Sequence, residues 1–386
     1  MRLTVAYFAH DLSDPAVNRR IRMLAAGGAS VRPIGFRRSS KAAALVEQMG
    51  AVDLGCTADG MLARRVHSVS RAFLTLNRHA DHVRGADVVL ARNLEMLMIA
   101  ARARKLYAPA ASLVYECLDI HRMLLSGRIS GTLLRALESR LWQQVDLLLT
   151  SSPAFIRSYF VPRSFPAPIR LIENKVLLLG SDYASVNSAR PPPGPPWRIG
   201  WFGMIRCRKS LEILSAVADA AGGTLEIIIR GRPSGATFPD FHAAVARLPH
   251  VSYGGPYRNP DDLPGIYNDV HFSWAIDYYE SGQNSTWLLP CRMYEGSLYG
   301  AVPLAIKGVE TSRWLQQRGA GVILEEPLKQ QLVDFFLRLN AINYTKLVKG
   351  MEALPRQDLF IDRADCRRLV EALRHPAMPE LLSTAG

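Results

Sequence analysis

A proline-rich stretch, SARPPPGPPW at 188–197, interrupts the middle of the chain, and the same sequence pattern lies on both sides of it. In each half, short β-like runs alternate with amphipathic helical stretches. This alternation is typical of a mostly parallel sheet covered by helices. The stretch itself has too many prolines for a helix or a strand, so we interpret it as a semi-rigid linker; the alternative is a surface loop within one domain.

The pattern predicts two Rossmann-like, doubly wound α/β domains. The chain has 386 residues, more than one hydrophobic core usually serves. We expect an N-terminal domain at 1–187, the linker at 188–197, a C-terminal domain at 198–350, and a helical segment at 351–386 that could cross back to the N-terminal domain. Ligands of such sheets bind beyond the carboxyl ends of the strands, so we expect the two domains to face a central cleft.

The expected elements can be placed along the chain. The strands predicted in the first half are 3–8, 31–36, 86–92, 112–119, 145–152 and 169–176. Those predicted in the second half are 197–203, 225–231, 250–255, 270–276, 302–306 and 321–326. A last helical section is expected from about 328 to 373.

The positive charge of the chain lies almost entirely in its first half. The net charge is +13; residues 1–180 hold 25 Lys and Arg against 13 Asp and Glu, and the remainder holds 22 against 21. Basic surfaces attract nucleic acid, anionic membranes or phosphorylated substrates. The chain has no helix-turn-helix, zinc or RNP-like motif and no stacking aromatic series, so we expect no nucleic acid as a partner. The alternative is a generally arginine-rich protein from a GC-rich genome.

Cysteine usage and hydropathy indicate the compartment. The five cysteines are far apart and form no C-x-x-C pair, which is typical of a reducing cytoplasm. No apolar run approaches the roughly 18–20 residues that a membrane span needs. The N-terminus turns acidic where a signal peptide would have its cleavage site, so we do not expect secretion.

A glycine followed by a basic loop opens the second half. In WRIGWFGMIRCRKSLEIL, the predicted strand ends at Gly203, and Arg206, Arg208 and Lys209 precede an amphipathic helix. Backbone N–H groups at such a turn, together with cations, form a phosphate site. Loops of this composition are common, so the pattern alone does not decide the matter.

A second candidate lies in WLLPCRMYEGSLYGAVP at 287–303. Pro290 suits a first helical turn, Arg292 lies in that turn, and Glu295 lies one turn further. The preceding ESGQNST contains Asn284 and Ser285, small polar groups next to a helix N-terminus, where an anion could bind. Glu295 could accept two hydrogen bonds from the vicinal diol of a ribose. The alternatives are a solvated helix face or an internal partner for Arg292.

The order of these motifs resembles the GT-B glycosyltransferases, specifically the family 4 type that builds bacterial exopolysaccharide and lipopolysaccharide. The resemblance covers about residues 1–350. Its motifs are G-x5-K (Gly203, Lys209) and P-x-K-x-x-E-x4-G-x-P (Pro290, Arg292, Glu295, Gly300, Pro303). The first half adds ECLDIHR at 116–122, VDLLLTSS at 145–152 and IENKV at 172–176. Within this family, the sequence looks most like those of the succinoglycan-type exopolysaccharide transferases.

The resemblance implies a nucleotide-diphosphate sugar as donor. Glu295 would hold its ribose, Arg292 and the helix N-terminus would lie near the diphosphate, and Lys209 with Arg206 would lie on the other side. Two departures bear on this. The first glutamate of the family's E-x7-E pattern would fall at Trp287; Glu280 is a possible substitute at the wrong spacing. Met204 stands where the family often has arginine, and Arg206 could compensate.

Glycosyl transfer needs a stabilised leaving group and a positioned acceptor hydroxyl. We expect no metal and no other cofactor, since Arg206, Lys209 and Arg292 could stabilise the diphosphate. Asp119 or Glu116 could act as general base in an inverting enzyme, or His121 could hold the donor sugar as in retaining members. The alternatives are that Glu116 pairs with an arginine and that His121 caps a helix.

The first strand–helix turn is the candidate acceptor site. It contains His10, Asp11 and Asp14, one of which could touch the acceptor. The alternative is that Asp14 or Ser13 caps the helix.

The basic first half fits a polyprenyl-diphosphate-linked saccharide acceptor, and a peripheral position at the inner face of the plasma membrane. The predicted membrane contacts are basic side chains with two apolar neighbours: Arg19, Arg20, Arg22, Arg37, Arg38, Lys41, Arg64, Arg65 and Arg71, with Phe36 or Phe73. Each basic residue near anionic lipid contributes about 1 kcal/mol. Salt-sensitive binding to anionic liposomes is the expected result. No oligomeric state is predicted.

Two other interpretations stay open. A nucleotide-sugar 2-epimerase has a related fold but releases no nucleotide diphosphate and needs no basic first domain. A catalytically inactive lobe could act as a scaffold for other synthesis enzymes, which the absent first glutamate makes credible.

Overall fold

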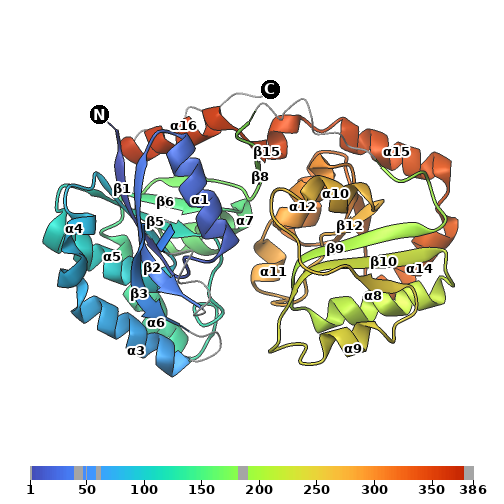
Figure 1. The fold of residues 1–386 in the computed structure, drawn as a ribbon, viewed down its shortest axis with the longest axis horizontal. Coiled ribbons are helices and arrows are strands. Elements are labelled where there is room, and N and C mark those ends of the chain that lie inside the picture. The colour runs from blue at the N-terminus through green and yellow to red at the C-terminus, as the bar shows by residue number, and fades with distance from the viewer. Residues whose placement is uncertain (1, 39–46, 49, 58–61, 181–189, 378–386) are drawn as a thin grey trace. The chain divides into compact units, whose positions relative to one another are not determined.

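The computed structural model describes residues 2–38, 47–48, 50–57, 62–180 and 190–377, without the side chains of 62–66. The chain forms two compact units (Figure 1). Unit 1 comprises Met1–Glu173 and Asp362–Gly386, and unit 2 comprises Asn174–Ile361. Each unit is built on one parallel sheet with helices packed against it, and each is described here by itself.

Unit 1 contains a seven-stranded sheet in the order β3-β2-β1-β4-β5-β6-β7, with every pairing parallel. Its strands are β1 (Thr4–Ala9), β2 (Ser30–Arg37), β3 (Val52–Cys56), β4 (Val88–Arg92), β5 (Ser112–Cys117), β6 (Leu147–Thr150) and β7 (Ile169–Leu171). Its principal helices are α1 (Pro15–Ala26), α3 (Leu62–Leu74), α4 (Ala80–Val83), α5 (Leu94–Tyr107), α6 (Ile129–Trp142), α7 (Pro153–Phe155) and α16 (Arg363–Arg374). The order of the strands reverses between β1 and β4, the place where such sheets bind ligands.

Unit 2 contains a six-stranded parallel sheet in the order β11-β10-β9-β12-β13-β14. Its strands are β9 (Trp197–Ile205), β10 (Leu225–Pro233), β11 (Val251–Tyr253), β12 (Phe272–Trp274), β13 (Val302–Ile306) and β14 (Val322–Leu324). Its helices are α8 (Arg208–Ala220), α9 (Phe241–Val245), α10 (Leu263–Asn268), α11 (Asn284–Trp287), α12 (Cys291–Leu298), α13 (Glu310–Gln317), α14 (Leu328–Arg338) and α15 (Ala341–Glu352). Here the strand order reverses between β9 and β12.

The prediction of two doubly wound, Rossmann-like α/β domains is confirmed. The strands form because their side chains are almost continuously apolar and buried: every residue of β4 is buried, and all but Arg92 are apolar. Such runs are typical of parallel strands that are covered on both faces. The sequence did not predict β3, whose VDLGC run alternates weakly and carries a charge.

The units divide at a different place from the predicted linker. A two-stranded sheet pairs β8 (Val176–Leu177) with β15 (Phe360–Ile361), which brings the chain after Glu173 into unit 2. β15 also interrupts the helical section expected from 328 to 373. The residues after β15 belong to unit 1, where α16 packs against α1. The described part of the predicted linker is 190–197, and all of it lies outside helices and strands except Trp197, the first residue of β9.

Gly27 at the end of α1 allows this packing. A Cβ atom there would lie 2.2 Å from the carbonyl oxygen of Cys366 and 2.6 Å from a methyl group of Val370 in α16. We expect Gly27→Ala to lower the free energy of unfolding by about 1–3 kcal/mol through overpacking. Gly235→Ala, which meets no atom within 4 Å, is the matched control. Urea titration of both variants checks this, and equal stabilities would contradict the docking of α16 on α1.

Candidate functional site

The predicted residues of unit 2 gather beyond the carboxyl ends of its strands. Gly203 lies near the end of β9, and Arg206 and Lys209 follow that strand. The loop from Ala275 to Gln283 follows β12, the neighbour of β9 at the reversal of strand order. α11 and α12 continue from that loop (Figure 1). The two sequence stretches that predicted a ligand therefore meet at one sheet edge.

Glu295 lies in α12 and is 6% exposed. Its Oε1 accepts a hydrogen bond from Asn259 Nδ2 at 2.9 Å, and its Oε2 accepts one from the Tyr267 hydroxyl at 3.0 Å. The alternative of a solvated helix face is therefore wrong. These donors fix the orientation of the carboxylate.

The tyrosines around Glu295 remain protonated. Burial, followed by the neighbouring Glu295 carboxylate, raises the pKa of Tyr267 well above its usual value, and the same two causes raise the pKa of Tyr257. The Tyr267 hydroxyl is therefore a permanent donor to Glu295. Sequence analysis missed Asn259 and Tyr267 because each lies far from Glu295 in the chain.

The strand predicted to end at Gly203 continues to Ile205, and its backbone favours glycine at position 203. Gly203 has φ +115°, a conformation that side chains rarely adopt. The neighbouring Gly231 of β10 approaches so closely that a Cβ atom on it would lie 1.8 Å from the Gly203 carbonyl oxygen.

Arg206 and Lys209 are exposed and lie over aromatic rings. The Arg206 guanidinium lies 4.5 Å from the ring centroid of Tyr279, and Lys209 Nζ lies 3.9 Å from that of Tyr278. Lys209 Nζ is also 3.6 Å from an oxygen of Glu326, which accepts a hydrogen bond from the Tyr278 hydroxyl. These tyrosines, which sequence analysis missed, hold both cations beside the end of β9.

Arg292 is held mainly by contacts within the protein. Its Nη2 donates to the carbonyl of Ile276 at 2.9 Å and lies 3.8 Å from Asp277 Oδ2. Asp277 in turn accepts from the backbone N–H of Tyr279 and from the Ser285 hydroxyl. Arg292 thus holds the loop after β12 in place, and Asp277 is a further residue that the motifs did not indicate.

Asn284 and Ser285 close the same loop. Asn284 Nδ2 donates to Glu280 Oε2 at 2.6 Å, and Ser285 Oγ accepts from the Glu280 N–H at 2.9 Å. Both residues are buried. Glu280, the suggested substitute for the family glutamate, therefore accepts a hydrogen bond from Asn284 in this loop.

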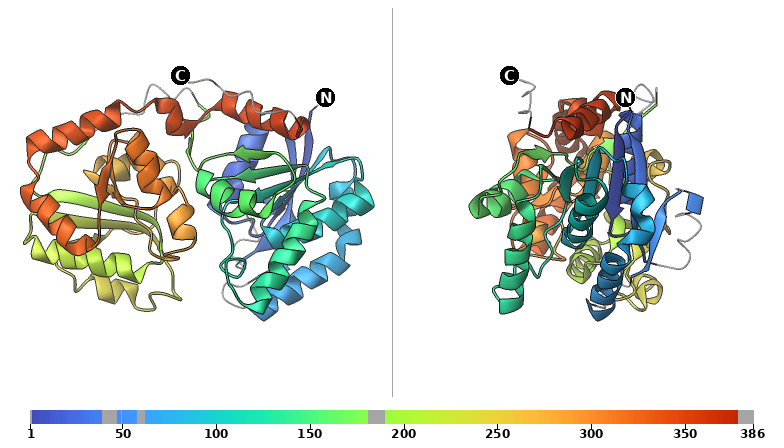
Figure 2. Two further views of the ribbon diagram at one scale, coloured as in Figure 1. Left: turned by 180° about the vertical axis from the view of Figure 1, so that it is seen from behind. Right: turned by 90° about the vertical axis from the view of Figure 1, so that its left-hand side faces the viewer.

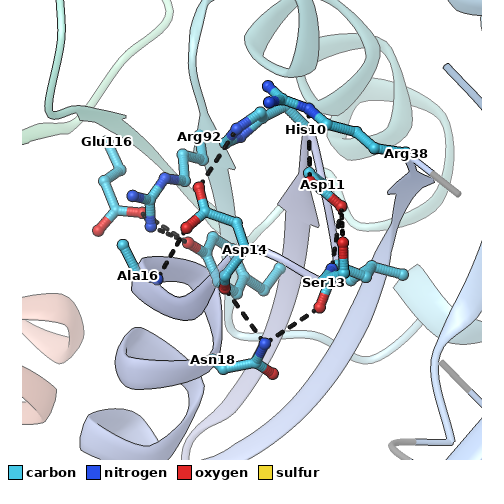
Figure 3. A network of polar contacts seen from close by, with 11 residues as sticks. His10, Asp11, Ser13, Asp14, Ala16, Asn18, Arg38, Arg92 and Glu116 are labelled. Carbon is cyan, nitrogen blue, oxygen red and sulfur yellow. Dashed lines mark hydrogen bonds and ion pairs between the residues drawn. The ribbon is translucent and has the colours of Figure 1, made fainter. Parts of the chain in front are cut away.

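In unit 1 the first strand–helix turn is a polar network (Figure 3). Asp14 is the N-cap of α1, since its side chain accepts from the Ala16 N–H at 2.8 Å, which confirms the capping alternative for this residue. His10 Nε2 lies 3.5 Å from Asp14 Oδ2. Asp11 accepts from the Ser13 hydroxyl at 2.6 Å and lies 3.4 Å from Arg38 Nε.

His10 is a largely buried, neutral imidazole. Burial, assisted by Arg92, lowers its pKa below the usual value. Its Nδ1 has no hydrogen-bond partner among the described residues. His10 therefore offers a neutral ring beside the Asp14 carboxylate rather than a positive charge.

Glu116 lies in the core of unit 1 and has no exposed surface. It accepts from the Tyr7 hydroxyl and from Arg20 Nε, both at 2.6 Å. Arg92 Nη1 lies 3.6 Å from it (Figure 3). Burial alone would raise the pKa of Glu116, but the two arginines and the hydrogen bonds hold it below the usual value. The structure thus places Glu116 in the arginine pairing that sequence analysis left as the alternative.

Asp119 and His121 lie on an exposed turn after β5. His121 Nδ1 accepts from the Met123 N–H at 3.3 Å, so the ring caps this turn rather than a helix. Of the three residues predicted as catalytic, Asp119 and His121 are exposed, whereas Glu116 is buried and pairs with arginine.

No cluster of three His, Cys, Asp or Glu side chains that could hold a metal ion occurs among the described residues. Within the same residues, none of the helices combines the length and the apolar character needed to cross a membrane.

Arg20 and Phe36, predicted as membrane contacts, are buried, so these two predictions are wrong. Arg20 is withdrawn from the surface by Glu116, and Phe36 belongs to the core. Lys41 and the side chains of Arg64 and Arg65 lie outside the described residues.

Comparison with known proteins identifies the family. No family model matches the sequence. The succinoglycan biosynthesis protein ExoL of Rhizobium meliloti (strain 1021) is 46% identical over 375 residues, which are 96% of this chain and 93% of ExoL.

Solved structures share the fold at low sequence identity. Anabaena Alr3699/HepE in complex with UDP and glucose has a TM-score of 0.66 and 14% identity, covering 96% of this chain and 98% of its own. The lipopolysaccharide outer core galactosyltransferase WaaB has a TM-score of 0.63 and 14% identity, covering 97% and 100%. The chain belongs to the family of the succinoglycan biosynthesis protein ExoL and is a glycosyltransferase of the GT-B fold.

Proposed function

We propose that this glycosyltransferase moves a sugar from a nucleotide-diphosphate sugar to a polyprenyl-diphosphate-linked saccharide in the synthesis of a succinoglycan-like exopolysaccharide. The observation that carries the donor class is the buried Glu295 carboxylate, held by Asn259 and Tyr267 beside the basic loop after β9. The likeness to ExoL over nearly the whole chain supports the polysaccharide, and the UDP and UDP-glucose bound to HepE support a uridine nucleotide.

In this proposal unit 2 holds the donor. Glu295 accepts hydrogen bonds from the ribose hydroxyls. Lys209 and Arg206 contact the diphosphate, helped by the N–H groups at the start of the thirteen-residue helix α8. Arg292 positions the loop after β12 through Ile276 and Asp277, so its contribution to the diphosphate is indirect.

The leaving group is stabilised without a metal. Lys209 reaches the diphosphate by giving up an exposed contact with Glu326, and exposed ion pairs contribute only about 0–1 kcal/mol. Positive charge placed where the leaving group develops negative charge lowers the barrier directly. Addition of a chelator is therefore expected to leave turnover unchanged.

Unit 1 holds the acceptor. Asp119 is the general base if the reaction inverts the anomeric centre, and His121 contacts the donor sugar if it retains it. The Glu116 carboxylate is surrounded by arginines and has no exposed surface, so it does not take the acceptor proton. His10, Asp11 and Asp14 form the polar edge that borders the acceptor.

One assay tests the function. Purified protein is incubated with UDP-, GDP- and dTDP-sugars, with and without a lipid-linked saccharide, and release of nucleotide diphosphate is measured. Acceptor-dependent release from one donor is the expected result. A 2-epimerase would convert the sugar without release, and an inactive scaffold would do neither.

Lys209 and Arg208 provide a matched pair for the diphosphate contact. Arg208 is also exposed, but its Nη2 donates to the carbonyl of Thr237, away from Tyr278. We expect Lys209→Met to weaken the binding of UDP by about tenfold, since hydrogen bonds to charged groups contribute about 1.5–3 kcal/mol. Arg208→Met should leave binding within about twofold. Calorimetric titration measures both, and equal losses would place the phosphates elsewhere.

A further inference from the structure

An apolar stripe runs along the outer face of α6 in unit 1. Ile129, Leu133 and Leu137 are 80%, 66% and 40% exposed. Residues spaced by four lie on one face of a helix, so the three side chains form a continuous row. In the left view of Figure 2, α6 lies on the near side of unit 1, with no other helix over it.

The charged groups around this row are positive. Arg122, Arg128 and Arg140 are exposed, and none of them forms an ion pair with another described residue. The one acidic side chain in α6, Glu138, points inward. It is fully buried, and it accepts from Tyr159 and from Arg163, each at 2.6 Å. The outer face of α6 therefore combines apolar side chains with uncompensated positive charge.

This face is tightly joined to the loop that precedes it. Arg135 of α6 donates to the carbonyls of Leu124 and Ser126 at 2.8 and 2.7 Å. Gly131 leaves no room for a Cβ atom, which would lie 2.4 Å from the Ser126 carbonyl oxygen. The same loop begins with Asp119 and His121, the exposed pair after β5, so the helix and this pair form one connected surface element.

We propose that the α6 face, made of Ile129, Leu133 and Leu137 with Arg122, Arg128 and Arg140, binds the surface of an anionic lipid bilayer. An exposed apolar row bordered by arginines is the arrangement by which interfacial helices bind anionic membranes. This docking would present Asp119 and His121 to an acceptor whose lipid remains in the bilayer, and in that respect it rests on the proposed function. The α6 face takes the place of the membrane-binding surface predicted from the sequence, which included the buried residues Arg20 and Phe36.

The test is cosedimentation of the full chain with vesicles of phosphatidylcholine, alone or mixed with phosphatidylglycerol. The double variant Ile129→Ser, Leu133→Ser should bind anionic vesicles at least about tenfold more weakly than the wild type, because two apolar side chains no longer enter the interface. The matched control is Leu337→Ser with Ile342→Ser, two helix residues of unit 2 that are 61% and 71% exposed. The control should bind as the wild type does.

The charge is tested by replacing Arg122, Arg128 and Arg140 with Gln. This variant should lose the preference for phosphatidylglycerol and most of the salt dependence. Replacing the exposed Arg247, Arg338 and Arg356 of unit 2 is the control. The proposal would be overturned if vesicle binding did not depend on lipid charge, or if the variant and the control lost vesicle binding equally.

Two further readouts separate the outcomes. Sedimentation velocity without lipid shows whether the α6 face instead joins two copies of the chain; a wild-type dimer that the Ser variant dissociates would overturn the membrane assignment. Calorimetric titration with UDP should be unchanged in the α6 variants. Loss of vesicle binding with intact nucleotide binding is the expected result, whereas a wild type that binds vesicles but no nucleotide would reject the proposed function alone.

Discussion

Replacement of Glu295 by Gln is expected to weaken the binding of UDP and of UDP-glucose by the same factor, about tenfold to a hundredfold. A hydrogen bond to a charged group contributes about 1.5–3 kcal/mol, and both ligands contain the ribose. Gln keeps the shape of the side chain, but its NH2 group would face Asn259 Nδ2 or the Tyr267 hydroxyl, which are both donors. A small loss of stability is therefore expected as well, and a thermal melt of each variant separates it from the loss of affinity.

A double-mutant cycle makes the assignment specific. If Glu295 binds the ribose, removal of its charge and removal of the ribose 2′-hydroxyl delete the same interaction, so their effects are not additive. Calorimetric titration of wild type and Glu295→Gln with UDP and 2′-deoxy-UDP measures this directly. Additive losses would show that Glu295 only supports the site.

Glu280→Gln is the control within the same site. Glu280 contacts Asn284 in the loop after β12 and is the residue that sequence analysis considered as a substitute for the absent family glutamate. If it binds the donor sugar, the Gln variant loses affinity for UDP-glucose and keeps it for UDP. If it only closes the loop, both ligands bind as before.

Sequence reasoning predicted the elements that local patterns encode. The alternation of buried strands and amphipathic helices predicted both parallel sheets, and the spacing of Pro290, Glu295 and Gly300 predicted α12. The amphipathic helix expected after the basic loop is α8, which begins at Arg208.

Sequence reasoning missed the contacts that join distant residues. The unit boundary depends on pairing between two-residue strands, β8 and β15, which are too short to show any periodicity. Asn259 reaches Glu295 across 36 residues, and Arg20 reaches Glu116 across 96. A carboxylate at the end of a predicted strand can be a catalytic group or a buried ion-pair partner. The sequence pattern is the same in both cases, and only the folded structure distinguishes them.

Glu116→Gln is expected to destabilise the protein by about 3–5 kcal/mol. Removal of one partner from a buried ion pair leaves the remaining charge uncompensated, and here the side chains of Arg20 and Arg92 would both stay buried. Glu212→Gln, which changes an exposed glutamate of α8, should alter the free energy of unfolding by no more than about 0.5 kcal/mol. Urea titration at neutral pH measures the two variants against the wild type.

The pH dependence of this difference tests its electrostatic origin. The folded state lowers the pKa of Glu116 below its usual value, so the unfolded state binds the proton first as the pH falls. The contribution of Glu116 is complete above the usual carboxyl pKa of about 4 and decreases as the pH falls through the folded-state pKa. The gap in stability between wild type and Glu116→Gln should therefore be constant near pH 7 and narrow toward acid. A variant that unfolds like the wild type but has lost acceptor-dependent turnover would contradict this assignment and return Glu116 to the role of general base.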